Sequence, residues 1–294
     1  MFDNISIQLL AGQLLIGLIN GSFYAMLSMG LAIIFGLMNV VNFAHGAQYM
    51  LGAFVAWLLL NFLGINYWGA LVLAPIVVAL FGLVTEKLVL KPLQNLDHLY
   101  GLLATYSVAL IVEGLVRQQY GSTGLPYPSP LPGGVNLGFM FMPWYRLWVV
   151  VFSLVTCLGT WLLIEHTRLG SYLRAANERP QMVEAFGINV PRMVTLTYGF
   201  GVGLAALSGV MAAPVYQVSP SMGSSVMIVI FAVVVIGGMG SIIGAVLTGY
   251  LLGFLEGLTK VFYPEAANMV VFVVMIFALI FRPNGLFAGS EKSR

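Results

Sequence analysis

Residues 165–192 read EHTRLGSYLRAANERPQMVEAFGINVPR and form the one concentrated patch of charge in a strongly apolar chain. Of the 22 charged side chains (12 Lys or Arg and 10 Asp or Glu), seven lie in this stretch: Glu165, Arg168, Arg174, Glu178, Arg179, Glu184 and Arg192. Apolar runs of membrane-spanning length flank it on both sides, and a central Arg or Asp in lipid costs roughly 2.5–3.5 kcal/mol. This charged segment is therefore predicted to be an aqueous loop, and its four Arg against three Glu favour the cytoplasm.

The composition of the whole chain indicates an integral membrane protein. Apolar residues make up 60% of it and charged residues 7%, with a mean hydropathy of +0.97. No Asp, Glu, Lys or Arg occurs from Asn4 to Thr85, so no soluble fold could cover its surface with this stretch. Long apolar runs favour helices over a β-barrel, whose strands would alternate apolar and polar residues. A net charge of +2 argues against a nucleic-acid partner.

Eight apolar segments predict the fold class, an all-α polytopic membrane protein with about eight transmembrane helices, some of them broken or re-entrant. The segments are about 8–35, 46–63, 67–90, 99–120, 147–164, 193–218, 224–257 and 264–281. We expect residues 1–294 to form a single transmembrane domain, with the charged segment as its cytoplasmic projection.

The segment 224–257 is too long for one crossing and is interrupted by Gly237-Gly238-Met239-Gly240-Ser241. If it crossed once, the basic C-terminal residues would lie outside the cell, against the positive-inside rule. A re-entrant pair of half-helices would return them to the cytoplasm. Counting crossings back from the cytoplasmic segment 165–192 places the N-terminus outside. Broken helices are tolerated where they are buried in protein or line a cavity.

A second interruption is predicted at residues 35–46, where Asn39, Asn42 and His45 recur every three residues. On a helix these side chains share one face. Paired interruptions in different parts of a chain often mark a transport pathway. The candidate pathway residues are therefore Asn39, Asn42, His45, Gly237, Gly238, Gly240 and Ser241. A helix-packing role for the same residues is equally compatible with the pattern.

The motifs of the common enzymes are missing from the sequence. It contains no phosphate-binding Gly-x-x-x-x-Gly-Lys-Ser/Thr loop and no Cys/His metal spacing, so neither a catalytic centre nor a cofactor is predicted. Two carboxylates in apolar segments, Glu113 and Glu256, each have a cation four residues later, Arg117 and Lys260. Structural pairing is favoured for both, which weakens the case for transport driven by an ion gradient.

The charged segment could instead receive energy from another protein. Residues 171–179 are of helical length, and Arg174 and Glu178 are spaced for an i,i+4 pair. Pro180 begins a second short helix, and Gly187 is placed to cap its C-terminus. Two short helices would present a knob to a soluble partner. The alternative is a passive amphipathic loop lying on the lipid surface.

Three separated motifs resemble the permeases of branched-chain amino acid ABC transporters, and in particular those of the H type. They are FGLMNVVNFAHGAQYMLGA at 35–53, GSYLRAANERPQMVEAFGINV at 170–190, and VIGGMGSIIGA at 235–245 followed by RPNGLF at 282–287. The likeness runs over nearly the whole chain.

The resemblance implies an inner-membrane subunit of a bacterial importer, without enzymatic activity of its own. Its partners would be a second permease chain, expected to be a related sibling, two cytoplasmic ATPase subunits that bind ATP and Mg²⁺, and a periplasmic substrate-binding protein. The coupling helix that docks to an ATPase would lie at 170–187. The residues assigned to this docking role are Gly170, Ser171, Arg174, Glu178, Arg179, Glu184 and Gly187. Similar permeases carry urea or short amides, and an autonomous channel or secondary transporter is the remaining alternative.

Overall fold

The computed structural model describes residues 7–38, 41–94 and 96–287, and its long helices coincide with the apolar segments. Within these ranges, seven helices are long and apolar enough to cross a membrane. They are α1 (Ile7–Met38), α2 (Ala44–Leu63), α3 (Tyr67–Thr85), α4 (His98–Tyr120), α5 (Trp144–Glu165), α8 (Val190–Tyr216) and α10 (Ile242–Phe262). Two apolar helices are shorter, α9 (Met222–Gly237) and α11 (Val270–Phe281). The predicted all-α polytopic fold is confirmed, although α11 is much shorter than the apolar segment that contains it.

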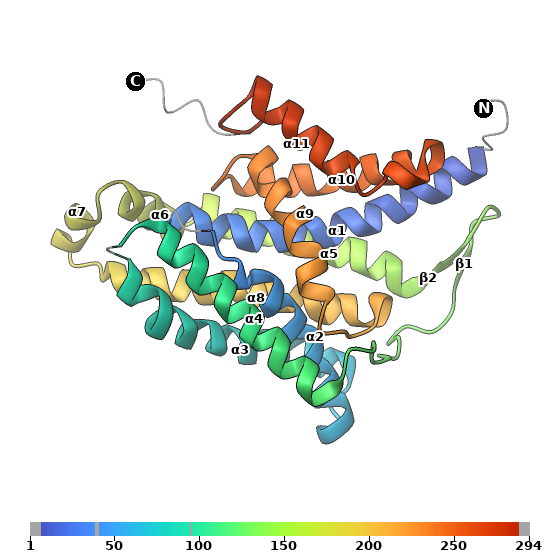
Figure 1. The fold of residues 1–294 in the computed structure, drawn as a ribbon, viewed down its shortest axis with the longest axis horizontal. Coiled ribbons are helices and arrows are strands. Elements are labelled where there is room, and N and C mark those ends of the chain that lie inside the picture. Colours follow the sequence, from blue (N-terminus) through green and yellow to red (C-terminus); the bar gives the residue numbers. More distant parts are fainter. Residues whose placement is uncertain (1–6, 39–40, 95, 288–294) are drawn as a thin grey trace.

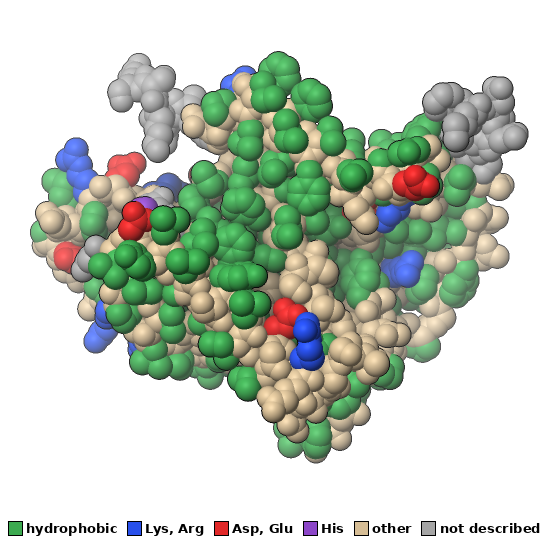
Figure 2. Space-filling model, viewed as in Figure 1, with side chains coloured by type: hydrophobic (Ala, Val, Ile, Leu, Met, Phe, Trp, Pro, Cys, Tyr) green, Lys and Arg blue, Asp and Glu red, His purple; other side chains and the backbone are tan. Residues whose placement is uncertain are grey.

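The helices run between two ends of one elongated bundle (Figure 1). One end carries α6 (Arg168–Glu178) and α7 (Pro180–Ala185) and is called the α6–α7 end below. The opposite, hairpin end carries the first residues of α1 and a small antiparallel hairpin of β1 (Gly134–Asn136) and β2 (Phe141–Pro143). On the face seen in Figure 2, many hydrophobic side chains are exposed between these ends, as expected for a lipid-facing belt.

Helices α9 and α10 form the broken pair that the glycine-rich interruption predicts. Helix α9 runs from the hairpin end towards the α6–α7 end and α10 runs back, so the pair enters and leaves at the same end (Figure 1). Helix α11 then brings the chain to the α6–α7 end, and α1 starts at the opposite end. This direction of travel agrees with the re-entrant arrangement inferred from the positive-inside rule.

A ladder of glycines holds α1 against α10. A Cβ atom on Gly253 would lie 2.5 Å from the Cα atom of Gly21, and one on Gly257 would lie 2.5 Å from the carbonyl oxygen of Gln13. A Cβ on Gly249 would lie 2.6 Å from the amide nitrogen of Ala25. The two backbones therefore touch along three turns, which is how small residues drive helix association in lipid. The Gly249, Gly253 and Gly257 spacing thus serves packing within the chain.

The chain beyond α11 closes over the end of α9. The amide of Leu286 donates to the carbonyl oxygen of Ile236 at 2.8 Å, and that of Phe287 donates to Gly237 at 3.2 Å. These bonds satisfy carbonyl groups that a helix C-terminus otherwise leaves open. The last described residues are therefore part of the structure around the break.

At the hairpin end, loop 121–143 contains no helix, in agreement with its Pro- and Gly-rich sequence. Leu125 and Val218 exchange two backbone hydrogen bonds, which join this loop to the end of α8. The Tyr145 hydroxyl donates to the carbonyl oxygen of Met211 at 2.8 Å and lies 3.1 Å from the Tyr67 hydroxyl. Three helices are thereby fixed beneath the loop.

Candidate functional site

The charged segment folds into two short helices, α6 and α7, which project from the α6–α7 end (Figure 1). Gly170 makes the reversal from α5 to α6 possible, because a Cβ atom there would overlap the carbonyl oxygen of Ile164. Arg179 joins the two helices in an extended conformation, and Pro180 occupies the first turn of α7. Phe186 is the C-cap residue of α7, and Gly187 after it has φ +83 and donates its amide to the carbonyl oxygen of Glu184 at 2.9 Å, so the glycine turns the chain at the end of the helix.

One face of this pair of helices is sealed against the bundle. Ala176, Val183 and Val190 form a small buried cluster between α6, α7 and the start of α8. The guanidinium of Arg174 lies 3.2 Å from the Glu165 carboxylate at the end of α5. This pair replaces the expected i,i+4 partner Glu178, because the reversal at Gly170 brings the end of α5 beside α6.

The opposite face is open and unusually apolar for a charged loop. Phe186 has 84% of its surface exposed. Three further apolar side chains of α6 and α7 are exposed, namely Leu169, Tyr172 and Met182. The assigned docking residues Ser171, Arg174, Glu178, Arg179 and Glu184 are all exposed as well. The surface therefore combines apolar side chains with both signs of charge.

The first group of candidate pathway residues lies in packed surroundings. Asn39 falls outside the described residues. Asn42 is buried and donates to Gln48 at 3.2 Å, and Gln48 in turn donates to the Tyr198 hydroxyl at 3.2 Å. His45 is fully buried, with Nε2 3.0 Å from the carbonyl oxygen of Leu27. Asn42 and His45 do not share a helix face, because α1 ends at Met38 and α2 begins only at Ala44.

The second group, at the α9–α10 break, is packed too. Gly238 and Gly240 both have positive φ, which forms the reversal between the two helices. A Cβ on Gly240 would lie 3.2 Å from the Cα atom of Gly36 in α1, and one on Gly237 would lie 2.6 Å from the carbonyl carbon of Gly244. The Ser241 hydroxyl accepts from the Gly244 amide at 3.1 Å and so caps α10. These contacts explain the residues as packing and capping groups in this conformation, and a pathway role stays a prediction.

Two buried carboxylates have partners that the sequence did not reveal. Glu86 follows α3 in a π-helical turn (Glu86–Leu90), is 1% exposed, and accepts from the Thr195 hydroxyl at 2.8 Å. Glu256 accepts from Lys260, as predicted, and also from two residues of α1, Tyr24 and Asn20. Their separation in sequence exceeds 230 residues, so no local spacing signals the contact.

A crevice of about 240 Å³ opens at the α6–α7 end beside the charged segment. It is lined by the end of α1, the turn after α3, the start of α4, and Ala176, Pro180 and Val190. Three other parts of the bundle therefore face the charged segment across this crevice. In the described ranges, no three His, Cys, Asp or Glu side chains come together to hold a metal ion.

Comparison with known proteins identifies close relatives over the full length. Residues 13–279 match the family model described as branched-chain amino acid transport system / permease component. The high-affinity branched-chain amino acid transport system permease protein BraD of Pseudomonas aeruginosa is 32% identical, covering 96% of this chain and 97% of that protein. The high-affinity branched-chain amino acid transport system permease protein LivH of Escherichia coli K12 is 29% identical, with 96% of each chain covered. A solved structure of PsaBC from Streptococcus pneumoniae in complex with a Fab aligns at a TM-score of 0.46 and 13% identity over 90% of this chain and 89% of that one.

Proposed function

The chain belongs to the family of branched-chain amino acid transport system permease components, and on that premise we propose that it forms the translocation pathway of an ATP-driven importer of leucine-type amino acids. As a member of this family it is a multi-pass protein of the bacterial inner membrane and a transport permease. The names of BraD and LivH favour branched-chain amino acids over urea or short amides as the cargo. In this proposal residues 1–294 act as one permease domain.

The proposed source of energy is a pair of cytoplasmic ATPase subunits that dock on α6 and α7. The observation that carries this step is the open face of the two helices. The Phe186 side chain is exposed over 84% of its surface, beside a base that the buried cluster of Ala176, Val183 and Val190 packs together. An apolar anchor surrounded by charges of both signs suits a groove on a soluble partner. ATP and Mg²⁺ are bound on that partner, and its closure moves α6 and α7 as a rigid body.

The remaining partners follow from the importer architecture. A second permease chain, in our proposal a diverged sibling, completes the pathway, and a periplasmic binding protein delivers the cargo at the hairpin end. The contact between Arg174 and Glu165 ties the docking helices to α5, and the short link of residues 186–189 ties them to α8. Movement of the docked segment is thus passed directly to two long helices.

The test compares two equally apolar, exposed phenylalanines at opposite ends of the bundle. Phe186→Glu places a charge in the proposed groove, whereas Phe62→Glu, at a site 73% exposed at the end of α2, does not. Co-purification of the ATPase subunits and leucine-stimulated ATP hydrolysis are measured in proteoliposomes. We expect both to be lost in Phe186→Glu and kept in Phe62→Glu. Normal coupling in Phe186→Glu, or leucine uptake by this chain alone without ATP, would overturn the proposal.

A further inference from the structure

An acidic residue lies well inside the apolar length of α10. Glu256 is 14 residues beyond the first residue of the helix and six before the last, Phe262. At 1.5 Å per residue it lies about 9 Å from the helix end, and a hydrocarbon core is about 30 Å thick. That helix end is at the hairpin end, remote from α6 and α7 (Figure 1). If the end of α10 lies at the edge of the hydrocarbon core, the carboxylate lies within the outer third of the membrane layer.

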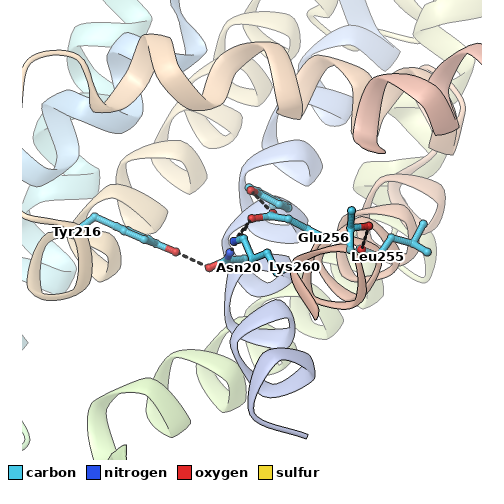
Figure 3. A network of polar contacts seen from close by, with 7 residues as sticks. Asn20, Tyr216, Leu255, Glu256 and Lys260 are labelled. Atoms are coloured by element: carbon cyan, nitrogen blue, oxygen red, sulfur yellow. Dashed lines mark hydrogen bonds and ion pairs between the residues drawn. The ribbon is translucent and has the colours of Figure 1, made fainter. Parts of the chain in front are cut away.

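Polar groups from three helices converge on this carboxylate (Figure 3). Tyr24 of α1 donates its hydroxyl to Glu256 Oε2 at 2.8 Å. On the other oxygen, Oε1, Lys260 donates at 2.5 Å and the Asn20 amide at 3.3 Å. Tyr216, at the end of α8, extends across to Asn20 and donates to its Oδ1 at 2.7 Å. The resulting cluster contains one negative charge, one positive charge and three neutral donors.

Holding α1 to α10 does not require this cluster. The glycine ladder of Gly249, Gly253 and Gly257 already brings the two backbones into contact over the same turns. Charged groups at membrane depth are costly, and they are retained chiefly where they serve a pathway or a ligand. A buried ion pair is in addition weak evidence for a stabilising role, because desolvation offsets its attraction.

The cluster is partly open to its surroundings. The Tyr216 residue is 47% exposed, and the Lys260 side chain is 33% exposed, whereas the Glu256 side chain is only 9% exposed. A molecule arriving from the hairpin end would meet a phenol and an ammonium group first. Displacing either partner would then uncover the carboxylate or the Asn20 amide behind it.

We propose that the cluster of Asn20, Tyr24, Tyr216, Glu256 and Lys260 is an entry site for the zwitterionic head of an α-amino acid. The cargo ammonium group takes the place of Lys260 on the Glu256 carboxylate, and the freed Lys260 and Tyr216 receive the cargo carboxylate. Such an exchange keeps the charges paired at every stage, which a low-dielectric setting requires. This inference rests on the proposed function, because it assigns the place where the pathway first contacts an amino-acid cargo.

The test uses the complete importer with its ATPase subunits and binding protein in proteoliposomes. Glu256→Gln removes the charge, and Tyr216→Phe removes a single oxygen from a half-exposed side chain. Glu113→Gln is the matched control, because Glu113 also pairs with a cation four residues later, Arg117, and this pair lies within one helix, α4. Maximal uptake rate is expressed per assembled complex, so that a loss of folding is not counted as a loss of transport.

We expect Glu256→Gln to lower the maximal uptake rate about ten- to a hundredfold and Tyr216→Phe about two- to tenfold, the effects of losing a charged and a neutral hydrogen bond. The half-saturating concentration of the binding protein and ATP hydrolysis without it should stay unchanged, because neither depends on the cluster. Glu113→Gln should stay within about threefold of the native rate.

Two outcomes would overturn the entry site. One is native uptake per complex in both cluster variants, as a purely structural tie that only reduces assembly would give. The other is a fall in uptake per complex in Glu113→Gln as large as that in Glu256→Gln. Failure of the proposed function would look different, because the unaltered importer itself would then take up no leucine on addition of ATP.

Discussion

The close contact of α1 and α10 predicts that a single added methyl group destabilises the protein. In Gly253→Ala the new Cβ atom would start 2.5 Å from both the Cα atom and the amide nitrogen of Gly21, where ordinary contacts begin at 3.4 Å. Both neighbours belong to backbone, which cannot rotate away, so the two helices must separate by about 0.9 Å.

The magnitude follows from two effects of that separation. Overpacking of a close interface costs about 1–3 kcal/mol. Moving α10 away from α1 also lengthens the hydrogen bonds from Tyr24 and Asn20 to Glu256, and a bond to a charged group contributes about 1.5–3 kcal/mol. The higher helix propensity of alanine offsets about 1 kcal/mol of this loss of stability. We expect a net loss of about 2–5 kcal/mol, which corresponds to roughly 5–15 °C in melting temperature.

The assay is thermal unfolding of the detergent-solubilised protein, followed by tryptophan fluorescence or by the fraction that stays monodisperse after heating. Gly159→Ala in α5 is the matched control, since nothing lies within 4 Å of a Cβ atom added there. That variant should melt at or slightly above the native temperature. If Gly253→Ala melts as high as Gly159→Ala, the two helices are not in backbone contact and the reasoning is refuted.

Three further outcomes are expected. Gly170→Ala should abolish leucine-stimulated ATP hydrolysis while the bundle remains folded. The added Cβ atom would overlap the Ile164 carbonyl oxygen and reorient α6, and unchanged stimulation of ATP hydrolysis would contradict this role of Gly170. Thr195→Val leaves the buried Glu86 carboxylate without its hydroxyl partner and should cost about 1.5–3 kcal/mol in thermal unfolding, with Thr195→Ser restoring stability. A cysteine at exposed Tyr172, in a background without the native cysteine, should react with membrane-impermeant thiol reagents only from the cytoplasmic side, and labelling of intact cells from outside would reverse the proposed topology.

Much of the fold could be predicted because its signals are local. The lack of charge from Asn4 to Thr85 is sufficient to identify a membrane protein, and the run Gly237–Ser241 marks the turn between α9 and α10. Gly187 was expected as a C-cap because a positive φ favours glycine, and the structure has φ +83 there. The turn at Gly237–Ser241 and the end of α7 at Gly187 each depend on residues within one or two turns of one another, and the membrane assignment depends only on composition along a continuous stretch.

The candidate site was harder to predict because its contacts are distant in sequence. Glu256 and Lys260 were recognised as a pair through their spacing, but Tyr24 reaches the same carboxylate across 232 residues. The polarity of Asn42 suggests a pathway residue, yet its side-chain amide donates a hydrogen bond to Gln48 within the core. The distant partners of a polar side chain in an apolar segment thus decide its role, and the local pattern does not report them.

The hydrogen bonds from Leu286 and Phe287 to the end of α9 impose an order on biogenesis. The carbonyl groups of Ile236 and Gly237 are reached by donors that lie 50 residues further along the chain. At about 5–20 residues per second, ribosomes need roughly 3–10 s to make that length. During this interval the carbonyl groups at the end of α9 lack the amide donors of Leu286 and Phe287. A chaperone or the insertion machinery can therefore bind this end of α9 before the bundle is complete.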